Sequence, residues 1–120
     1  MLFDKEMKML FLCLAGTSGV VEIPEGVETI AQLAFDHCVE VTNIHLPNSL
    51  REVGQGAFYC CWKLSEITIP KNVSLLPDGV FEACWDLTGI HAAAENNSFV
   101  SLDGVFFDKS MKRLIAYPAS

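Results

Sequence analysis

A histidine and a cysteine at matching places in a repeated sequence form the pair of residues closest to a catalytic arrangement. His37 and Cys60 are 23 residues apart, which is the spacing of the repeat described below. Neighbouring copies would bring the imidazole near the thiol, as in the thiolate–imidazolium pairs of cysteine nucleophiles. No motif supplies an orienting carboxylate or an oxyanion hole, and the edge of a repeat stack excludes water poorly. We therefore interpret the pair as a polar residue beside a partly exposed thiol, and the sequence predicts no enzyme.

The five cysteines favour a buried, reduced column over a disulfide framework or a metal site. Cys38, Cys61 and Cys84 share one repeat position, where a small apolar residue is wanted inside a coil. Their spacing is far from that of a Cys-x-x-Cys ligand pair, and three thiols in a line cannot surround a tetrahedral ion. Adjacent coils bring column neighbours to about 5 Å, so distance alone does not exclude a bridge. We expect reduced thiols, with no bound metal and no cofactor.

An aromatic column is the first candidate surface for binding a partner. Trp62 and Trp85 occupy one position outside the core, and Tyr59 lies three residues before Trp62, on the same side if that turn is helical. Stacked, exposed tryptophans would suit a protein contact, because aromatic residues are enriched in binding hot spots. The alternative is that the indoles pack over the turns and merely cover the coil.

A polar column on the predicted strands is the second candidate surface. Repeat proteins often bind partners on their sheet face. An ordinary solvated sheet face is the alternative. The column consists of Glu22, His45, Thr68 and His91.

The elements that position these residues follow from the repeat itself. Residues 21–41, 44–64 and 67–87 align without a gap, with prolines, phenylalanines and cysteines in register. A period of this size indicates a stacked solenoid. Each copy opens with alternating residues typical of a short half-buried strand, and a proline should end that strand. A tight inward-pointing loop and a short helical turn, such as residues 55–61, complete the coil. Stacking then predicts a phenylalanine ladder and a thiol ladder.

Hairpin units are expected at both ends of the repeats. Residues 3–8 are echoed by residues 107–112, and the repeat fades after Ile90 into strand-like runs around an Asp-Gly turn. We therefore divide a single domain of residues 1–120 into an N-terminal hairpin-like unit (1–18), about three repeats (19–94) and a C-terminal hairpin unit (95–120). A short stack has two open ends with unpaired strand edges, so a homodimer through one end is expected if the hairpin units cap these ends poorly.

Composition narrows the classes of function. With 51% hydrophobic residues the chain is a folded domain, and a net charge of −7 with scattered basic residues argues against binding nucleic acid. Residues 1–16 imitate a secretion signal, but Asp4 and Glu6 stand where positive charge belongs, so we interpret them as a structural unit. No stretch is long enough to insert into a membrane.

The repeat resembles the BspA-type, or Treponema pallidum-type, leucine-rich repeat. The residues that carry the resemblance in one copy are Leu64, Ile67, Ile69, Pro70, Val73, Leu76, Val80, Phe81 and Cys84. The resemblance implies an α/β, right-handed leucine-rich-repeat solenoid with short parallel strands, short helical turns and flanking β-hairpin units.

Family members are typically surface or secreted proteins of host-associated bacteria. The resemblance therefore implies non-enzymatic binding of host or microbial surface proteins in adhesion, and it brings no catalytic motif. The missing signal and the reduced-looking cysteines suggest an alternative, an intracellular protein-interaction scaffold.

Overall fold

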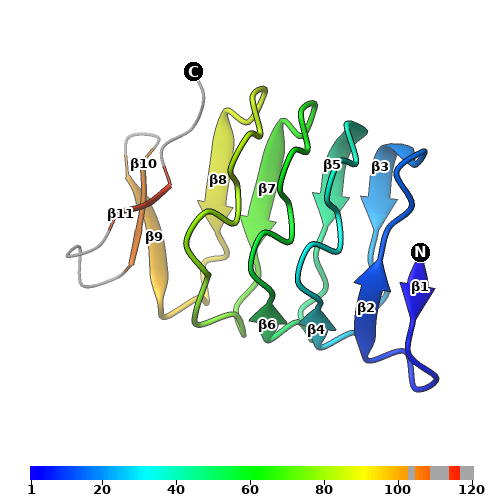
Figure 1. Cartoon of the computed structure of the whole chain (residues 1–120). Helices are drawn as coiled ribbons and strands as arrows, with labels where there is room; N and C mark the ends of the chain where they lie inside the picture. Colours follow the sequence, from blue (N-terminus) through cyan, green and yellow to red (C-terminus); the bar gives the residue numbers. More distant parts are fainter. Residues whose placement is uncertain (103–104, 109–113, 117–120) are drawn as a thin grey trace.

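Alternating side chains at the start of each repeat form the strands of the main sheet. The computed structural model describes residues 1–102, 105–108 and 114–116. Four parallel strands lie side by side in one sheet (Figure 1). In order along the stack they are β3 (Ser18–Glu22), β5 (Glu40–His45), β7 (Glu66–Ile69) and β8 (Gly89–Ala92). Each of the first three ends within two residues of a repeat proline, as the missing backbone donor of proline predicts. We call this sheet the strand side of the coil.

A second, narrower sheet combines two strands of the predicted N-terminal hairpin-like unit with two short strands where the sequence predicts only a tight loop. Its members are β1 (Leu2–Phe3), β2 (Met9–Leu12), β4 (Thr29–Ile30) and β6 (Glu52–Val53). β4 pairs in parallel with β2 on one side and with β6 on the other. In Figure 1 these strands lie in front of the main sheet. The inward direction predicted for this segment is nevertheless confirmed, because Val27, Ile30, Leu50 and Val53 are all buried.

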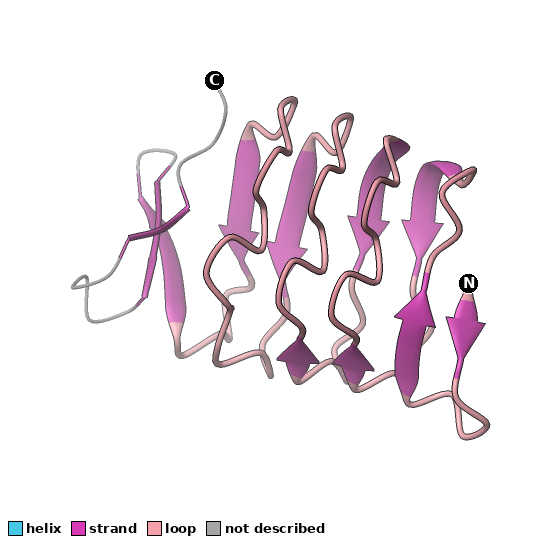
Figure 2. Cartoon of the chain, viewed as in Figure 1, coloured by secondary structure: helices cyan, strands magenta, loops and turns pink. Residues whose placement is uncertain are grey.

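The predicted short helical turns are wrong, because the described residues contain strands and loops but no helix (Figure 2). Where the sequence predicts helical turns, each coil has a tight turn instead. These turns cover residues 31–38, 54–61 and 77–84, and together we call them the turn side. Two residues in each coil have a left-handed backbone, which a right-handed helix does not contain. They are Leu33, Gly56 and Gly79 in one column and His37, Cys60 and Ala83 in another, with φ between 57° and 71°.

Hydrogen bonds between coils explain why turns replace the helix. The N–H of Phe35 donates to the carbonyl of Ala57 in the next coil at 2.8 Å, whereas the N–H of Asp36 donates within its own coil to Leu33 at 3.1 Å. This alternation runs over residues 33–38. A helix would direct every amide into its own coil. Residues 33–38 instead give every second amide to the next coil, as a strand does, and the N–H of Cys60 likewise donates to Glu82 in the following coil.

The core consists of columns that cross the coils. The predicted phenylalanine ladder is confirmed, because the ring centroids of Phe35 and Phe58 are 5.5 Å apart and those of Phe58 and Phe81 are 5.8 Å apart. Phe35 and Phe58 are fully buried, and Phe81 is partly buried at the far end of the ladder. Rings at this spacing contact both neighbours.

The predicted thiol ladder is confirmed as well, and all five cysteines are free and buried. Cys13 extends the column of Cys38, Cys61 and Cys84, and each of the last three donates its S–H to a carbonyl of the preceding coil. Burial, and then the neighbouring Cys13, raise the pKa of Cys38 to about 12. The hydrogen bond with Cys84, together with burial, also raises the pKa of Cys61. These thiols are therefore protonated at neutral pH.

The same hairpin geometry occurs at both ends of the described chain. β1 and β2 pair antiparallel, as do β10 (Val105–Asp108) and β11 (Leu114–Ala116), and β10 also pairs antiparallel with β9 (Phe99–Leu102). In the first hairpin Leu2 faces Leu12 and Phe3 faces Leu10; in the second Phe106 faces Ala116 and Phe107 faces Leu114. Both hairpins shift register between these two pairs. The predicted Asp-Gly turn at 103–104 lies outside the described residues, and the predicted unit boundaries stay predictions.

A buried asparagine stands where the repeats end. Asn96 occupies the position that Val73 fills one coil earlier, and it is only 1% exposed. Its side-chain N–H groups donate to the carbonyls of Pro70 and Val73 at 2.8 and 3.0 Å. Its side-chain oxygen accepts from the N–H groups of Ser98 and Phe99. This amide satisfies backbone groups on both sides of the boundary, so it closes the stack and positions the start of β9.

Candidate functional site

The two tryptophans stack on each other at the surface, each directly after one of the tight turns of the turn side. The ring centroids of Trp62 and Trp85 are 5.2 Å apart, and the ring planes differ by 9°. Trp62 is 40% exposed and Trp85 is 65% exposed, and neither belongs to the buried core. The N–H of Asp86 donates to the carbonyl of Trp62 at 3.0 Å, which fixes the two coils beneath the rings. The pair is therefore a flat aromatic surface of two indoles.

Tyr59 contacts a different group of residues. Its ring packs edge-on against the imidazole of His37, with centroids 6.1 Å apart. The prediction that Tyr59 joins Trp62 rested on a helical turn, and that turn is absent. Tyr59 lines a separate hollow of about 290 Å³ that includes Gln55 and Glu82. Its role in binding stays a prediction.

The polar column lies along the exposed face of the strand side. Glu22 pairs with His45 across β3 and β5, and Thr68 pairs with His91 across β7 and β8. All four side chains are exposed. The His45 Nδ1 and Glu22 Oε1 atoms are 3.2 Å apart, which is an exposed ion pair when the imidazole is protonated. The structure therefore places the column as predicted, while its binding role stays a prediction.

A cleft interrupts this face between β5 and β7. The two strands, both described in full, pair only through Asn43 and Glu66, so the ladder opens just before the histidine column. The hollow has a volume of about 270 Å³, and His45 of β5 and Thr68 of β7 both line it. The sequence gives no sign of this opening, because the 23-residue spacing is the same on both sides of it.

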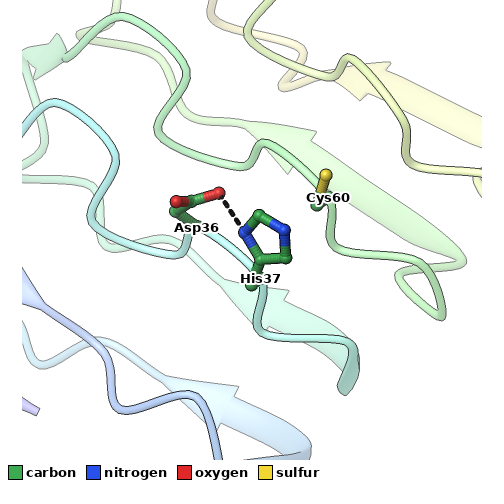
Figure 3. A group of neighbouring side chains, drawn as sticks. All are labelled: Asp36, His37 and Cys60. Carbon is green, nitrogen blue, oxygen red and sulfur yellow. Dashed lines mark hydrogen bonds and ion pairs between the residues drawn. The ribbon is translucent and has the colours of Figure 1, made fainter.

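An aspartate, a histidine and a cysteine meet on the turn side (Figure 3). His37 and Cys60 do come together, as their shared column predicts, and Asp36 joins them. One nitrogen, oxygen or sulfur atom from each side chain lies within 4.8 Å of the other two. The Asp36 Oδ1 atom accepts a hydrogen bond from His37 Nδ1 at 2.7 Å, or pairs with the imidazolium there. Cys60 is 8% exposed, so the expectation of a partly exposed thiol is wrong.

Sequence reasoning missed Asp36 because it follows no motif and immediately precedes His37. Adjacent residues in a strand point to opposite faces, and adjacent residues in a helix diverge around its axis. The left-handed backbone at His37, with φ of 59°, removes both patterns. The glycines at positions 56 and 79, which suit left-handed turns, are the one signal that could have predicted this geometry.

Comparison with protein families identifies the repeat. The model of the BspA-type leucine-rich repeat region (six copies) matches residues 14–118. This chain belongs to the BspA-type leucine-rich repeat family. A comparison with curated protein sequences gives no match.

Solved structures of other leucine-rich repeat proteins share the fold of this BspA-type chain. A leucine-rich cell surface protein from Faecalibacterium prausnitzii A2-165 is 31% identical with a TM-score of 0.74, over 84% of this chain and 26% of its own. The pneumococcal vaccine antigen PcpA is 30% identical with a TM-score of 0.59, over 78% of this chain and 29% of its own. A leucine-rich repeat protein from Eubacterium ventriosum ATCC 27560, 20% identical with a TM-score of 0.65 over 93% of this chain and 39% of its own, supports the fold alone.

The BspA-type chain spans between about a quarter and two fifths of the length of these structures. Where the structure describes the chain, it contains no helix that is both long and apolar enough to span a bilayer.

Proposed function

We propose that this chain is a protein-binding module that attaches to surface proteins of a host or of another microbe, with the Trp62–Trp85 pair as its main contact. The stacked, exposed indoles carry the proposal. Exposing large aromatic side chains to water is unfavourable, so an exposed aromatic patch marks an interaction site. Tryptophan is among the residue types that are enriched in binding hot spots. The two rings are already fixed by the coils beneath them, so little side-chain freedom is lost on binding.

The surroundings of the pair resemble the rim of a protein interface. The column next to the tryptophans is Glu40, Lys63 and Asp86, which alternates in charge. Lys63 Nζ and Glu40 Oε2 are 2.7 Å apart, and both side chains remain half exposed. An aromatic centre with a polar, hydrated rim is the common anatomy of such interfaces.

Similarity to known proteins supports a location at the cell surface. The Faecalibacterium protein is described as a cell surface protein, and the pneumococcal protein as a vaccine antigen. Both are about 30% identical to this chain over most of its length. Both of these proteins are much longer than this chain, so surface attachment of this chain is part of the proposal.

The test is binding of the purified chain to a panel of immobilised matrix glycoproteins and to host cells, measured by surface plasmon resonance and flow cytometry. We expect saturable binding that the double variant Trp62→Ser/Trp85→Ser weakens by about 30-fold, the loss that corresponds to one hot spot. Leu75→Ser is the matched control, because Leu75 is as exposed as Trp85 (69% against 65%) but lies outside the pair.

The strand side is the second candidate surface, and the cleft between β5 and β7 favours it. The variant His45→Ala/His91→Ala tests it in the same assay. Binding lost in this variant, and retained without the tryptophans, would move the interface to the strand side. A folded wild-type chain that binds nothing on the panel, and that is found inside the producing cell, would contradict surface attachment and favour the intracellular scaffold.

A further inference from the structure

We propose that Asp36, His37 and Cys60 form a binding site for a divalent transition metal ion of the zinc type. This inference is independent of the proposed function. A carboxylate, an imidazole and a thiolate are the three kinds of side chain that bind zinc in proteins. Atoms of all three lie within 4.8 Å of one another on the turn side, and in Figure 3 the imidazole lies between the carboxylate and the thiol.

The geometry is close to that of a tetrahedral site. Bonds of about 2.0–2.3 Å to zinc place tetrahedral ligand atoms roughly 3.3–3.8 Å apart. The hydrogen-bonded Asp36 and His37 atoms, at 2.7 Å, must open, and the widest separation, at most 4.8 Å, must close by about 1 Å. Side-chain rotation supplies both changes, because His37 is exposed and Asp36 is partly exposed.

The backbone fixes two of the three ligands in advance. The N–H of His37 donates to the carbonyl of Tyr59, the residue before Cys60, at 3.1 Å. The N–H of Cys60 donates in turn to Glu82 in the following coil at 3.1 Å. Ligands that are already held at short range lose little freedom when an ion binds. The site therefore needs only small movements of side chains.

Cys60 differs from the other cysteines in a way that suits a ligand. The other four belong to the hydrophobic core, whereas Cys60 is buried next to the surface and stands outside that cluster. The left-handed backbone at Cys60 is shared by Ala83 in the next coil, so it belongs to the repeat and is no sign of function by itself. The boundary between the coils of His37 and Cys60 is distinguished by its side chains, which are those of Asp36, His37 and Cys60.

The donor set also selects the class of ion. A sulfur, a nitrogen and an oxygen ligand suit zinc and its neighbours, whereas magnesium and calcium prefer oxygen alone. The net charge of −7 favours cations in general. Three protein ligands leave a fourth position, which water or a side chain of a partner would fill.

The test is titration of the full chain with Co²⁺ under anaerobic conditions. Cobalt is the probe because a thiolate bound to it gives a charge-transfer band in the near ultraviolet, and tetrahedral coordination gives strong visible bands. We expect both to saturate at one ion per chain and to disappear when zinc is added. Cys60→Ala, which places at this position the residue of the next coil, should abolish the charge-transfer band.

Further variants separate the three ligands. His37→Ala and Asp36→Asn should each weaken cobalt binding by about tenfold or more, the loss expected when a group that holds or orients the ion is removed. His45→Ala is the control, because His45 also pairs with a carboxylate but has no cysteine in its cluster. It should bind cobalt as the wild type does. Cys60→Ser is the second cysteine variant if Cys60→Ala does not fold.

Three results would overturn the site. The first is a folded wild-type chain without a charge-transfer band at millimolar Co²⁺. The second is a band that persists in both Cys60 variants, which would assign the signal to the core thiols. The third is unchanged affinity in Asp36→Asn, which would leave two ligands and no three-residue site.

Discussion

The strand side and the turn side repeat with the same 23-residue period but hold their residues in place differently. On the strand side every second side chain points outward. The residue type at one outward position therefore differs between repeats, as with His45 and Thr68, without any contact with the core. On the turn side the left-handed positions fix where a side chain leaves the backbone, and His37, Cys60 and Ala83 share one conformation. Similar backbone with different side chains is a means of placing chemistry on a repeat without altering the fold.

Truncation of the phenylalanine ladder is the largest expected effect. Phe58→Ala should lower the free energy of unfolding by about 3–5 kcal/mol, because the ring is fully buried and contacts the rings of both neighbours. Urea denaturation measures this change. Thr68→Ala on the exposed strand side is the control, with a change below about 0.5 kcal/mol. Equal losses in the two variants would contradict the assignment of the core to columns.

Replacing the asparagine at the end of the repeats should be the second largest effect. Asn96→Leu restores the residue type of Leu50 in the same column, yet it removes four hydrogen bonds to backbone groups. We expect a loss of about 1–3 kcal/mol, since buried backbone groups lose their partners. Thermal unfolding measures it. A more stable variant would show that the column prefers an apolar residue even at the boundary.

Alkaline pH should destabilise the thiol ladder. The pKa of Cys38 is raised to about 12, whereas the unfolded thiol titrates near 9.0. Above pH 9 the unfolded chain therefore loses a proton that the folded chain retains, and stability falls as pH rises toward 12. The slope for one thiol is on the order of 1 kcal/mol per pH unit. Denaturant curves between pH 8 and 10.5 measure it, and Cys38→Ala should show a shallower slope than the wild type.

Replacing one residue on each side by glycine should give the smallest effects and the most direct comparison of the two sides. Ala83→Gly should be neutral or should stabilise by up to about 1 kcal/mol, because glycine adopts a left-handed backbone without strain. Thr68→Gly, on a strand, should destabilise by about 0.5–1 kcal/mol. Paired melting curves measure both changes. A loss of the same sign and size in both variants would remove the distinction between the two sides.

The strand side was predictable because both of its determinants are local. Alternation along Val21, Glu22 and Ile23 and the proline that follows are visible within one repeat, and the period aligns them between repeats. The core columns follow from the same two patterns. The stacking of Trp62 on Trp85 also follows, because residues in one column become neighbours in space.

The turn side was not predictable in the same way, because its hydrogen bonds cross between coils. Ala57, Phe58 and Cys61 have a spacing that suits a helix, and all three are buried, yet the amide of Cys60 between them donates to Glu82 in the next coil. Leu33 in the left-handed column conceals the glycine pattern of the later repeats. The position of Asp36 depends on this backbone, so the three-residue cluster was only partly visible in the sequence.

The direction of the ladders has a mechanical consequence. Hydrogen bonds between parallel strands, and those between neighbouring turns, join each coil to the next, so they point along the stack. A force that pulls the two ends of the stack apart therefore acts on the boundaries between coils in series, so every boundary bears the same force and the weakest one separates first. Within the main sheet, the boundary with the fewest paired residues is the one between β5 and β7, where the strands share a single residue pair. Under tension the molecule should part there first and leave two folded halves.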